Sequence, residues 1–331
     1  MSAQTQPLGA ASWWARLRSG AGSSQLGIYV VFVLVVLVSY VVVTAAGGTF
    51  NWRNMAVRSV ALGIVSVGQT LVILAGSLDL SVAYLVSVSA VLTSFIMDGQ
   101  AANMPLAIGV VLLVGAVVGA VNGLLITKLR VHPFITTLGT GLVMRGLLSS
   151  RFSAQTGQVA PEFSQVLGYG LVGPVPVSVI VFALVAAAAI WMLRSTQFGS
   201  HLYAVGGSQE IARLSGVRSD RTLVITHVLC SLTAVLTGLY IAARLRAGAP
   251  WVGPDGGYDL ESIAAVVLGG TALSGGRGGV GGTVAGVLIL AVLDYVFNQL
   301  QVDGFLKMVL RGVIIIAAVA TYTARSKRAS E

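Results

Sequence analysis

One candidate for a phosphate-binding loop is the glycine-rich stretch "VLGGTALSGGRGGVGG" (267–282), which has eight glycines between positions 269 and 282. Backbone N–H groups of such a loop can bind a nucleotide phosphate. A Walker A loop also requires a Gly-Lys pair, whereas Lys128, Lys307 and Lys327 follow Thr, Leu and Ser. The chain therefore has no P-loop, and a tight reversal between two short helices explains the glycines better.

A second stretch, "ILAGSLDLSVAYL" (73–85), ends one apolar run and begins the next. Ser77 and Asp79 are residue types that cap helix N-termini, and an acid suits the positive end of the helix dipole. Capping alone explains both residues. The alternative is that Asp79 positions a helix break beside a pathway or a partner.

The most charged stretch contains "SQEIARLSG" (208–216), which reads as a short capped helix. Ser208 is the expected N-cap, Glu210 lies in the first turn, and Gly216 is the expected left-handed stop. Ile211 and Leu214 give this helix an apolar ridge, and a helix of two turns is not stable alone. It must pack either on its own membrane domain or in a groove of another protein.

No recognisable catalytic set accompanies these stretches. The sequence has neither a His-Glu-x-x-His motif nor a nucleophile elbow. The single cysteine, Cys230, lies in an apolar run and has no partner in the chain for a disulfide. We therefore expect this chain not to be an enzyme.

Composition decides the class of protein. The chain has 331 residues, of which 56% are hydrophobic and 9% charged, whereas soluble domains carry about 25% charged residues. Ten long runs lack any charge, and six of them have at least 18 residues, close to the roughly 20 that cross a membrane. The sequence predicts an all-α integral membrane protein with about ten transmembrane helices, some of them short or broken.

The transmembrane helices position the three stretches described above. The distribution of Lys and Arg also predicts which loops between the helices face the cytoplasm. The expected helices span 25–46, 55–75, 81–97, 105–126, 133–150, 176–193, 222–245, 259–272, 280–298 and 305–323. With residues 1–24 and the basic tail 324–331 cytoplasmic, twelve Lys and Arg residues fall inside and eight outside, a modest bias in the usual direction. The transmembrane domain is then 25–323, with an inside loop at 194–221 and outer surface loops at 151–176 and 244–261.

Two further patterns concern helix packing. Gly115, Gly119 and Gly123 are four residues apart within one apolar run, the spacing that lets helix backbones approach closely. The segments "LRVHPF" (129–134) and "LQVDGF" (300–305) share Leu-x-Val-x-x-Phe. This similarity suggests two inverted five-helix halves, and chance similarity between apolar segments is the alternative.

Three motifs together resemble a known family. "GQTLVILAGSLDLSV", "GSHLYAVGGSQEIARLSGV" and "ESIAAVVLGGTALSGGRGGVGGTVAG" are similar to the membrane-spanning permease subunits of bacterial ABC sugar importers of the ribose, xylose and arabinose type. The resemblance covers about residues 26–323. Gly199 and Ala204 match the family's cytoplasmic motif. In the same motif, Val217 stands where Ile is usual and Ile211 where a small residue is usual. In the first motif, Ser77 stands where Gly is usual.

The resemblance implies roles for two sets of residues. The cytoplasmic loop corresponds to a coupling helix that docks on an ATP-binding subunit, and the other two motifs form a helix-break or gating signature. The coupling set is Gly206, Gly207, Ser208, Glu210, Ile211, Ala212, Arg213, Leu214, Ser215 and Gly216. The helix-break set is Gly76, Asp79, Ser81, Gly269, Gly270, Gly275, Gly276 and Arg277.

The implied function is ATP-driven import of a monosaccharide or a similar small polyol by alternating access. The implied partners are an ATP-binding subunit, a periplasmic sugar-binding protein, a second permease copy or paralogue, and membrane lipid, but no nucleic acid. ATP and Mg²⁺ would bind the partner subunit, and this chain would bind no cofactor or metal. The implied location is the bacterial cytoplasmic membrane, with both termini cytoplasmic.

A stand-alone ion-coupled secondary transporter is the main alternative function. Such carriers usually have acids or histidines deep within their membrane helices. Of the three histidines, only His227 lies clearly within an expected helix, near its start. The sequence therefore favours the ATP-driven importer, and an intramembrane enzyme has the least support.

Overall fold

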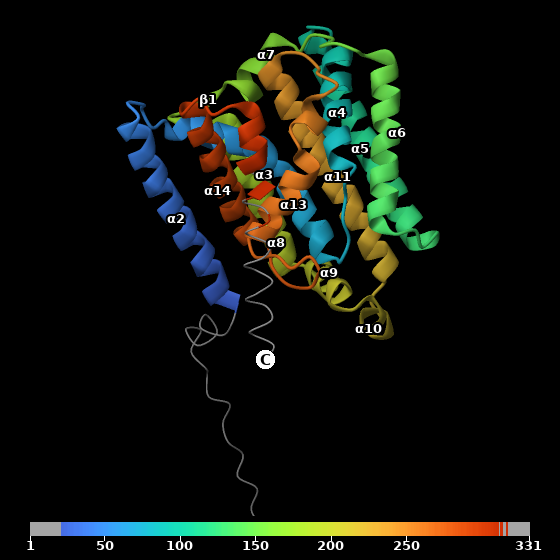
Figure 1. The fold of residues 1–331 in the computed structure, drawn as a ribbon. Helices are drawn as coiled ribbons and strands as arrows, with labels where there is room; N and C mark the ends of the chain where they lie inside the picture. Colours follow the sequence, from blue (N-terminus) through green and yellow to red (C-terminus); the bar gives the residue numbers. More distant parts are fainter. Residues whose placement is uncertain (1–20, 311, 314–315, 317–331) are drawn as a thin grey trace, which may run out of the picture.

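The computed structural model describes residues 21–310, 312–313 and 316, and this part of the chain is mainly helical (Figure 1). Its longer helices are α2 (Ala21–Ala45), α3 (Trp52–Leu74), α4 (Val82–Met97), α5 (Met104–Lys128), α6 (Pro133–Arg151), α8 (Val177–Ser195), α9 (Gln197–Gly207), α11 (Ser219–Leu245), α13 (Tyr258–Leu268) and α14 (Val280–Gln299). The short elements are η1 (Ala101–Asn103), α7 (Pro161–Phe163), η2 (Ser164–Gly168), α10 (Gln209–Leu214), α12 (Val252–Asp255) and an antiparallel hairpin of β1 (Leu171–Val172) and β2 (Val175–Pro176).

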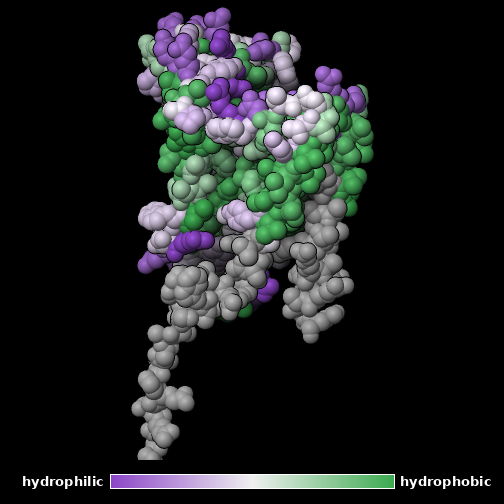
Figure 2. Space-filling model, turned by 90° about the vertical axis from the view of Figure 1, so that its left-hand side faces the viewer, coloured by the Kyte–Doolittle hydropathy of each residue, from purple (hydrophilic) through white to green (hydrophobic). Residues whose placement is uncertain are grey.

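Six helices of the described residues are long and apolar enough to cross a membrane, namely α2, α3, α5, α8, α11 and α14. An apolar belt covers the helices in Figure 2, and polar side chains gather at the end above it. The predicted all-α membrane protein is thus confirmed. The count of ten helices stays a prediction, because its last segment, 305–323, falls largely outside the described residues.

Helix α13 is shorter than the predicted helix 259–272, since it ends at Leu268. Gly269 and Gly270 follow, and Gly270 has a φ of +87°, a conformation that continues no helix. With eleven residues, α13 is about 16 Å long and does not cross a bilayer alone. It is one of the short helices that the sequence led us to expect.

The helices form an inner and an outer set. About 89% of the membrane-length window of α3 and 67% of that of α11 is buried, against 11% for α2. Gly119 of α5 faces the backbone of α11 so closely that an added Cβ would lie 2.6 Å from the carbonyl oxygen of His227. Gly115 and Gly123 make similarly close approaches to α11. The predicted close packing along these glycines is confirmed.

The two ends of the bundle differ. The end that carries α9, α10 and the loop 269–279 is called the lower end below, and the end with α7 and the β1–β2 hairpin is the upper end (Figure 1). The predicted upper loop 151–176 does consist of short helices and turns.

The predicted outer loop 244–261 does form turns and a short helix, α12, but it does not lie wholly at the surface, because part of it descends into the protein. Gly248 packs against Ser94 near the upper end of α4, whereas the Gly253 N–H donates a hydrogen bond to Ser87 Oγ at 2.9 Å. Ser94 and Ser87 are seven residues apart in one helix, a distance of about 10 Å. The glycines and prolines of this segment predict turns, but they do not show how far the segment descends into the protein.

We predict that Gly119→Ala destabilises the chain, because its methyl group would push α5 away from the α11 backbone. The expected loss in unfolding free energy is about 1–3 kcal/mol, measured by denaturation of the purified protein in detergent. Gly109→Ala is the matched control on the same helix, since nothing lies within 4 Å of its added Cβ. Equal stability of the two variants would contradict the close α5–α11 contact.

Candidate functional site

The stretch 208–216 forms the capped helix that the sequence predicts. The Ser208 hydroxyl accepts a hydrogen bond from the Ile211 N–H at 3.3 Å, and Gly216 adopts a φ of +84° just after the helix, as a left-handed stop does. The preceding helix α9 was not predicted. Thr196, whose hydroxyl accepts from the Gly199 N–H at 3.3 Å, is the N-cap signal that could have revealed it.

The faces of α10 differ in burial. Ala212 is 3% exposed and anchors the helix, whereas Ile211 is 66% and Leu214 83% exposed. The apolar ridge is therefore not covered by the described part of this chain. Of the two alternatives for this ridge, the exposure favours a groove on another protein.

The charged residues in and around α10 differ in whether they form ion pairs. Glu210 is exposed. Arg213 Nη2 lies 3.2 Å from Asp220 Oδ1, so this arginine is already paired within its own chain. Lys128 Nζ approaches the other oxygen of Asp220 at 4.0 Å. Because these pairs are solvent-accessible, their contribution to stability is small.

Backbones of three distant segments meet just above α10. Gly276 N–H donates to Leu74 O at 3.0 Å, and a Cβ added to Gly206 would lie 1.7 Å from that same oxygen. A Cβ on Gly275 would lie 2.7 Å from Gly206 O and 2.9 Å from the nitrogen of Gly76. We call Gly76, Gly206, Gly275 and Gly276 the glycine junction. It joins the end of α3, the end of α9 and the glycine-rich loop, which are the three motifs of the sequence.

A tyrosine makes a second link between α9 and the glycine-rich loop. The Tyr203 hydroxyl donates to Gly278 O at 2.9 Å. Burial raises the pKa of the Tyr203 phenol above its usual value, and the nearby Arg194 opposes this shift only in part. The phenol therefore stays neutral at physiological pH and keeps its donor proton.

Three other predicted site residues of the glycine-rich loop lie outside the glycine junction. Gly269 packs against the backbone of Gly282, which brings the end of α13 onto the start of α14. Gly270 faces open space, and Arg277 is exposed on the lower end. The structure thus brings Gly275 and Gly276 to the junction but not these three residues.

A cavity of about 390 Å³ lies beside the junction. Its walls include Gly76, Gly206 and Ser208, and Arg130 and His132 from the turn between α5 and α6. Arg130 and His132 lie in the segment "LRVHPF" (129–134), which suggested an internal repeat but not a cavity. A φ of +56° at Arg130 marks this tight turn, but no sequence pattern near it indicates a cavity.

The stretch after α3 is held by buried polar groups. Asp79 and His227 are both 0% exposed, and Asp79 Oδ2 lies 3.3 Å from His227 Nδ1. His227 Nε2 shares a hydrogen bond with Ser77 Oγ at 3.0 Å, so Ser77 does not cap the next helix, contrary to prediction. Asp79 Oδ1 accepts from the N–H of Ser81 at 2.9 Å, and Ser81 is the N-cap residue of α4.

This network continues into two more helices. Asn122 Nδ2 of α5 donates to Ser81 Oγ at 3.0 Å, and the Thr140 hydroxyl of α6 donates to Asn122 Oδ1 at 2.5 Å. The break between α3 and α4 is thus fixed to α5, α6 and α11. A buried ionisable pair persists only when its partners satisfy it, and here each member has a partner.

The chain is a helical membrane domain with a close-packed backbone junction at one end, and the comparisons place it among membrane transport proteins. Residues 51–319 match the family described as "branched-chain amino acid transport system / permease component". The chain belongs to this family of permease components. No solved structure matches the chain.

Individual relatives are sugar permeases. The chain is 38% identical to the ribose import permease protein RbsC of Escherichia coli K12 over 275 residues, which cover 81% of this chain and 84% of RbsC. It is 33% identical to the L-arabinose transport system permease protein AraH of the same organism over 313 residues, 92% of each chain. Identity to the galactose/methyl galactoside import permease protein MglC is 31% over 312 residues, 89% of this chain and 92% of MglC. The resemblance drawn from the three motifs is confirmed.

We predict that Gly206→Ala opens the glycine junction, because its methyl group would overlap Leu74 O. Amide hydrogen exchange in 269–279 should become faster as the Gly276 hydrogen bond is lost. Gly207→Ala is the matched control, with nothing within 4 Å of its added Cβ. Equally slow exchange in both variants would show that the junction does not depend on this contact.

We also predict that Asp79 and His227 are energetically coupled. Removing either partner alone, as Asp79→Ala or His227→Ala, should lower the unfolding free energy by about 3–5 kcal/mol, because the other group stays buried and unpaired. The double variant should lose less than the sum of the two. Strictly additive losses in denaturation experiments would refute the pairing.

Proposed function

We propose that this chain is the permease subunit of an ATP-driven ABC importer for a monosaccharide or a similar small polyol. The observation that carries the proposal is the apolar ridge of Ile211 and Leu214 on α10, which is exposed although Ala212 anchors the helix. Such a ridge fits a groove on another protein. The relatives named for ribose, L-arabinose and galactose support a monosaccharide as the cargo.

In the proposed mechanism, ATP and Mg²⁺ bind a separate ATP-binding subunit, which hydrolyses the ATP and moves α10. This movement reaches the membrane domain through Gly206, which touches Leu74 at the end of α3 and Gly276 in the glycine-rich loop. The loop leads directly into α14. A rigid displacement at one contact would therefore act on two membrane helices together, as alternating access requires.

The proposed arrangement places the lower end in the cytoplasm of a bacterial cell, with this chain in the cytoplasmic membrane and both termini inside. A periplasmic sugar-binding protein would deliver the cargo to the upper end, where α7 and the β1–β2 hairpin lie. A second copy of the chain or a paralogue would complete the transport route. The chain itself would bind no cofactor, and its other neighbours would be membrane lipid.

Replacing Leu214 by Ser should weaken binding of the ATP-binding subunit by about tenfold or more, because a leucine would no longer be buried at the contact. The measurement is co-purification of the ATP-binding subunit with the tagged chain in mild detergent. Leu129→Ser is the control, since Leu129 has 66% exposure and follows α5 at the same end of the bundle. Arg213 is a poorer probe, because its substitution would also break the pair with Asp220.

Equal co-purification with both variants would reject α10 as the docking helix. Transport by the chain alone in liposomes, without ATP and driven by an ion gradient, would instead favour the ion-coupled carrier. The buried Asp79–His227 pair would then be the first candidate for ion coupling, because such pairs occur in proton relays.

A further inference from the structure

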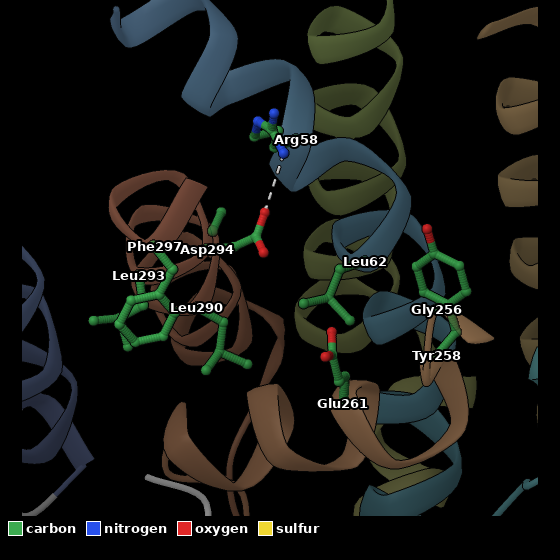
Figure 3. A pocket seen from close by; sticks show the side chains of 10 residues that line it. Arg58, Leu62, Gly256, Tyr258, Glu261, Leu290, Leu293, Asp294 and Phe297 are labelled. Carbon is green, nitrogen blue, oxygen red and sulfur yellow. Dashed lines mark hydrogen bonds and ion pairs between the residues drawn. The ribbon is translucent and has the colours of Figure 1, made fainter. Parts of the chain in front are cut away.

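A second cavity, of about 210 Å³, lies between α3, α13 and α14 (Figure 3). None of the four glycines of the junction lines it. Its lining combines charged, aromatic and aliphatic side chains. The residues that matter below are Arg58, Tyr258, Glu261, Leu293, Asp294 and Phe297. The cavity is smaller than the roughly 300–1,000 Å³ of pockets for drug-sized molecules, so it suits a small ligand.

The charged groups converge on this cavity from three helices. Arg58 Nη1 of α3 lies 3.3 Å from Asp294 Oδ2 of α14, and the Glu261 side chain points toward the same space from α13 (Figure 3). The Arg58 and Asp294 side chains are 40% and 24% exposed. Partly exposed charges on membrane helices are costly against lipid and normally face water or protein. This side of α3 and α14 is therefore not lipid-facing.

The cavity also lies below the upper surface. Arg58 is six residues into α3, or about 9 Å along the helix. Gly256 and Tyr258, which also line the cavity, follow the segment that descends along α4. Irregular backbone within a membrane protein occurs where it is buried in protein or lines a water-filled cavity. Broken helices such as α12 and α13 commonly border transport sites near the middle of a membrane.

The chemistry of the lining favours a neutral polyhydroxylated ligand. Carboxylates only accept hydrogen bonds and a guanidinium only donates them, so Glu261, Asp294 and Arg58 together can satisfy both roles of a hydroxyl group. The rings of Tyr258 and Phe297 offer apolar walls for the C–H face of a sugar. An inorganic anion would meet two carboxylates, and a metal ion would meet the guanidinium.

The lining helices also connect this cavity to the glycine junction. Helix α3 ends at Leu74, whose carbonyl accepts from Gly276, and the loop with Gly276 joins α13 to α14. Arg58 and Leu74 are sixteen residues apart on α3, or about 24 Å. A movement of the junction would therefore shift all three walls of the cavity.

We propose that this cavity is a monosaccharide-binding station on the transport route, in which Glu261 and Asp294 accept hydrogen bonds from sugar hydroxyls. The proposal rests on the proposed import function. In this proposal, α3, α13 and α14 contact the cargo. The sugar hydroxyls also bind the Arg58–Asp294 pair, with Arg58 as the donor and Asp294 as the acceptor.

The first test is Glu261→Gln, which keeps the shape of the side chain and removes its charge. Initial uptake of radiolabelled D-ribose, L-arabinose and D-galactose is measured in cells that carry the chain with its binding protein and ATP-binding subunit. Uptake of the transported sugar should fall about tenfold or more, because hydrogen bonds to charged groups are strong. Asp259→Asn is the matched control, since Asp259 also lies in the first turn of α13 but not in the cavity lining.

A second test does not depend on the folding of a charge variant. Cys230 is the only cysteine of the chain and is fully buried, so Leu293→Cys supplies a single accessible thiol in the cavity wall. Under ATP turnover in proteoliposomes with binding protein, the transported sugar should slow labelling of this thiol by a polar methanethiosulfonate reagent. A sugar that is not transported should leave the labelling rate unchanged.

The outcomes separate the two proposals. Normal uptake by Glu261→Gln, or equal losses in Glu261→Gln and Asp259→Asn, would overturn the binding station, as would labelling of Leu293→Cys that sugar does not slow. The cavity would then hold an ion pair that fastens α14 to α3. If the unaltered chain, with its binding protein and ATP-binding subunit, imported neither a monosaccharide nor a small polyol, the proposed function itself would fail, and with it the sugar as ligand.

Discussion

The lower end of this protein depends on contact between backbones that leaves no room for side chains. Leu74 O accepts a hydrogen bond from Gly276, and Gly206 lies against the same oxygen. Even one methyl group at position 206 would overlap that carbonyl. Glycine is required at such positions because only hydrogen on Cα permits this approach. The constraint joins the end of α3, the end of α9 and the loop before α14, although Leu74 and Gly206 are 132 residues apart in the sequence.

The interior above the junction is organised around α11. This helix packs against α3, α4 and α5, and most of its residues are buried. Its His227 contacts Asp79 and Ser77 in the stretch between α3 and α4. Hydrogen bonds in a buried site are strong, and leaving one unmade is costly. The break between α3 and α4 is therefore a defined shape rather than a loose linker. This explains how a chain interruption can sit beside the junction without loosening it.

Much of this architecture follows from local sequence signals. Long charge-free runs predict the membrane helices, and Ser208 with Gly216 predicts both ends of α10, because capping involves only neighbouring residues. The spacing of Gly115, Gly119 and Gly123 likewise predicts a face that packs closely.

Other features depend on contacts between distant residues, which no single sequence reveals. Nothing near Ser77 indicates that its partner is His227, 150 residues away. The exposure of Leu214 and the burial of Ala212 depend on which side of α10 meets the bundle. The glycine-rich loop predicted a tight reversal, but no local signal indicated that Gly275 and Gly276 would meet Gly76 and Gly206. The descent of the loop at Gly253 was missed for the same reason.

The position of α13 has an electrostatic consequence. The N-terminal end of a helix carries a partial positive charge, and in α13 this end borders the cavity of Arg58 and Asp294. Asp259 and Glu261 lie in its first turn, where their charges offset both that dipole and the guanidinium. A site placed at a bare helix terminus would attract phosphate and other anions from the surrounding solution. The acidic first turn removes this attraction, so uncharged solutes would enter without competition from the anions that are always present.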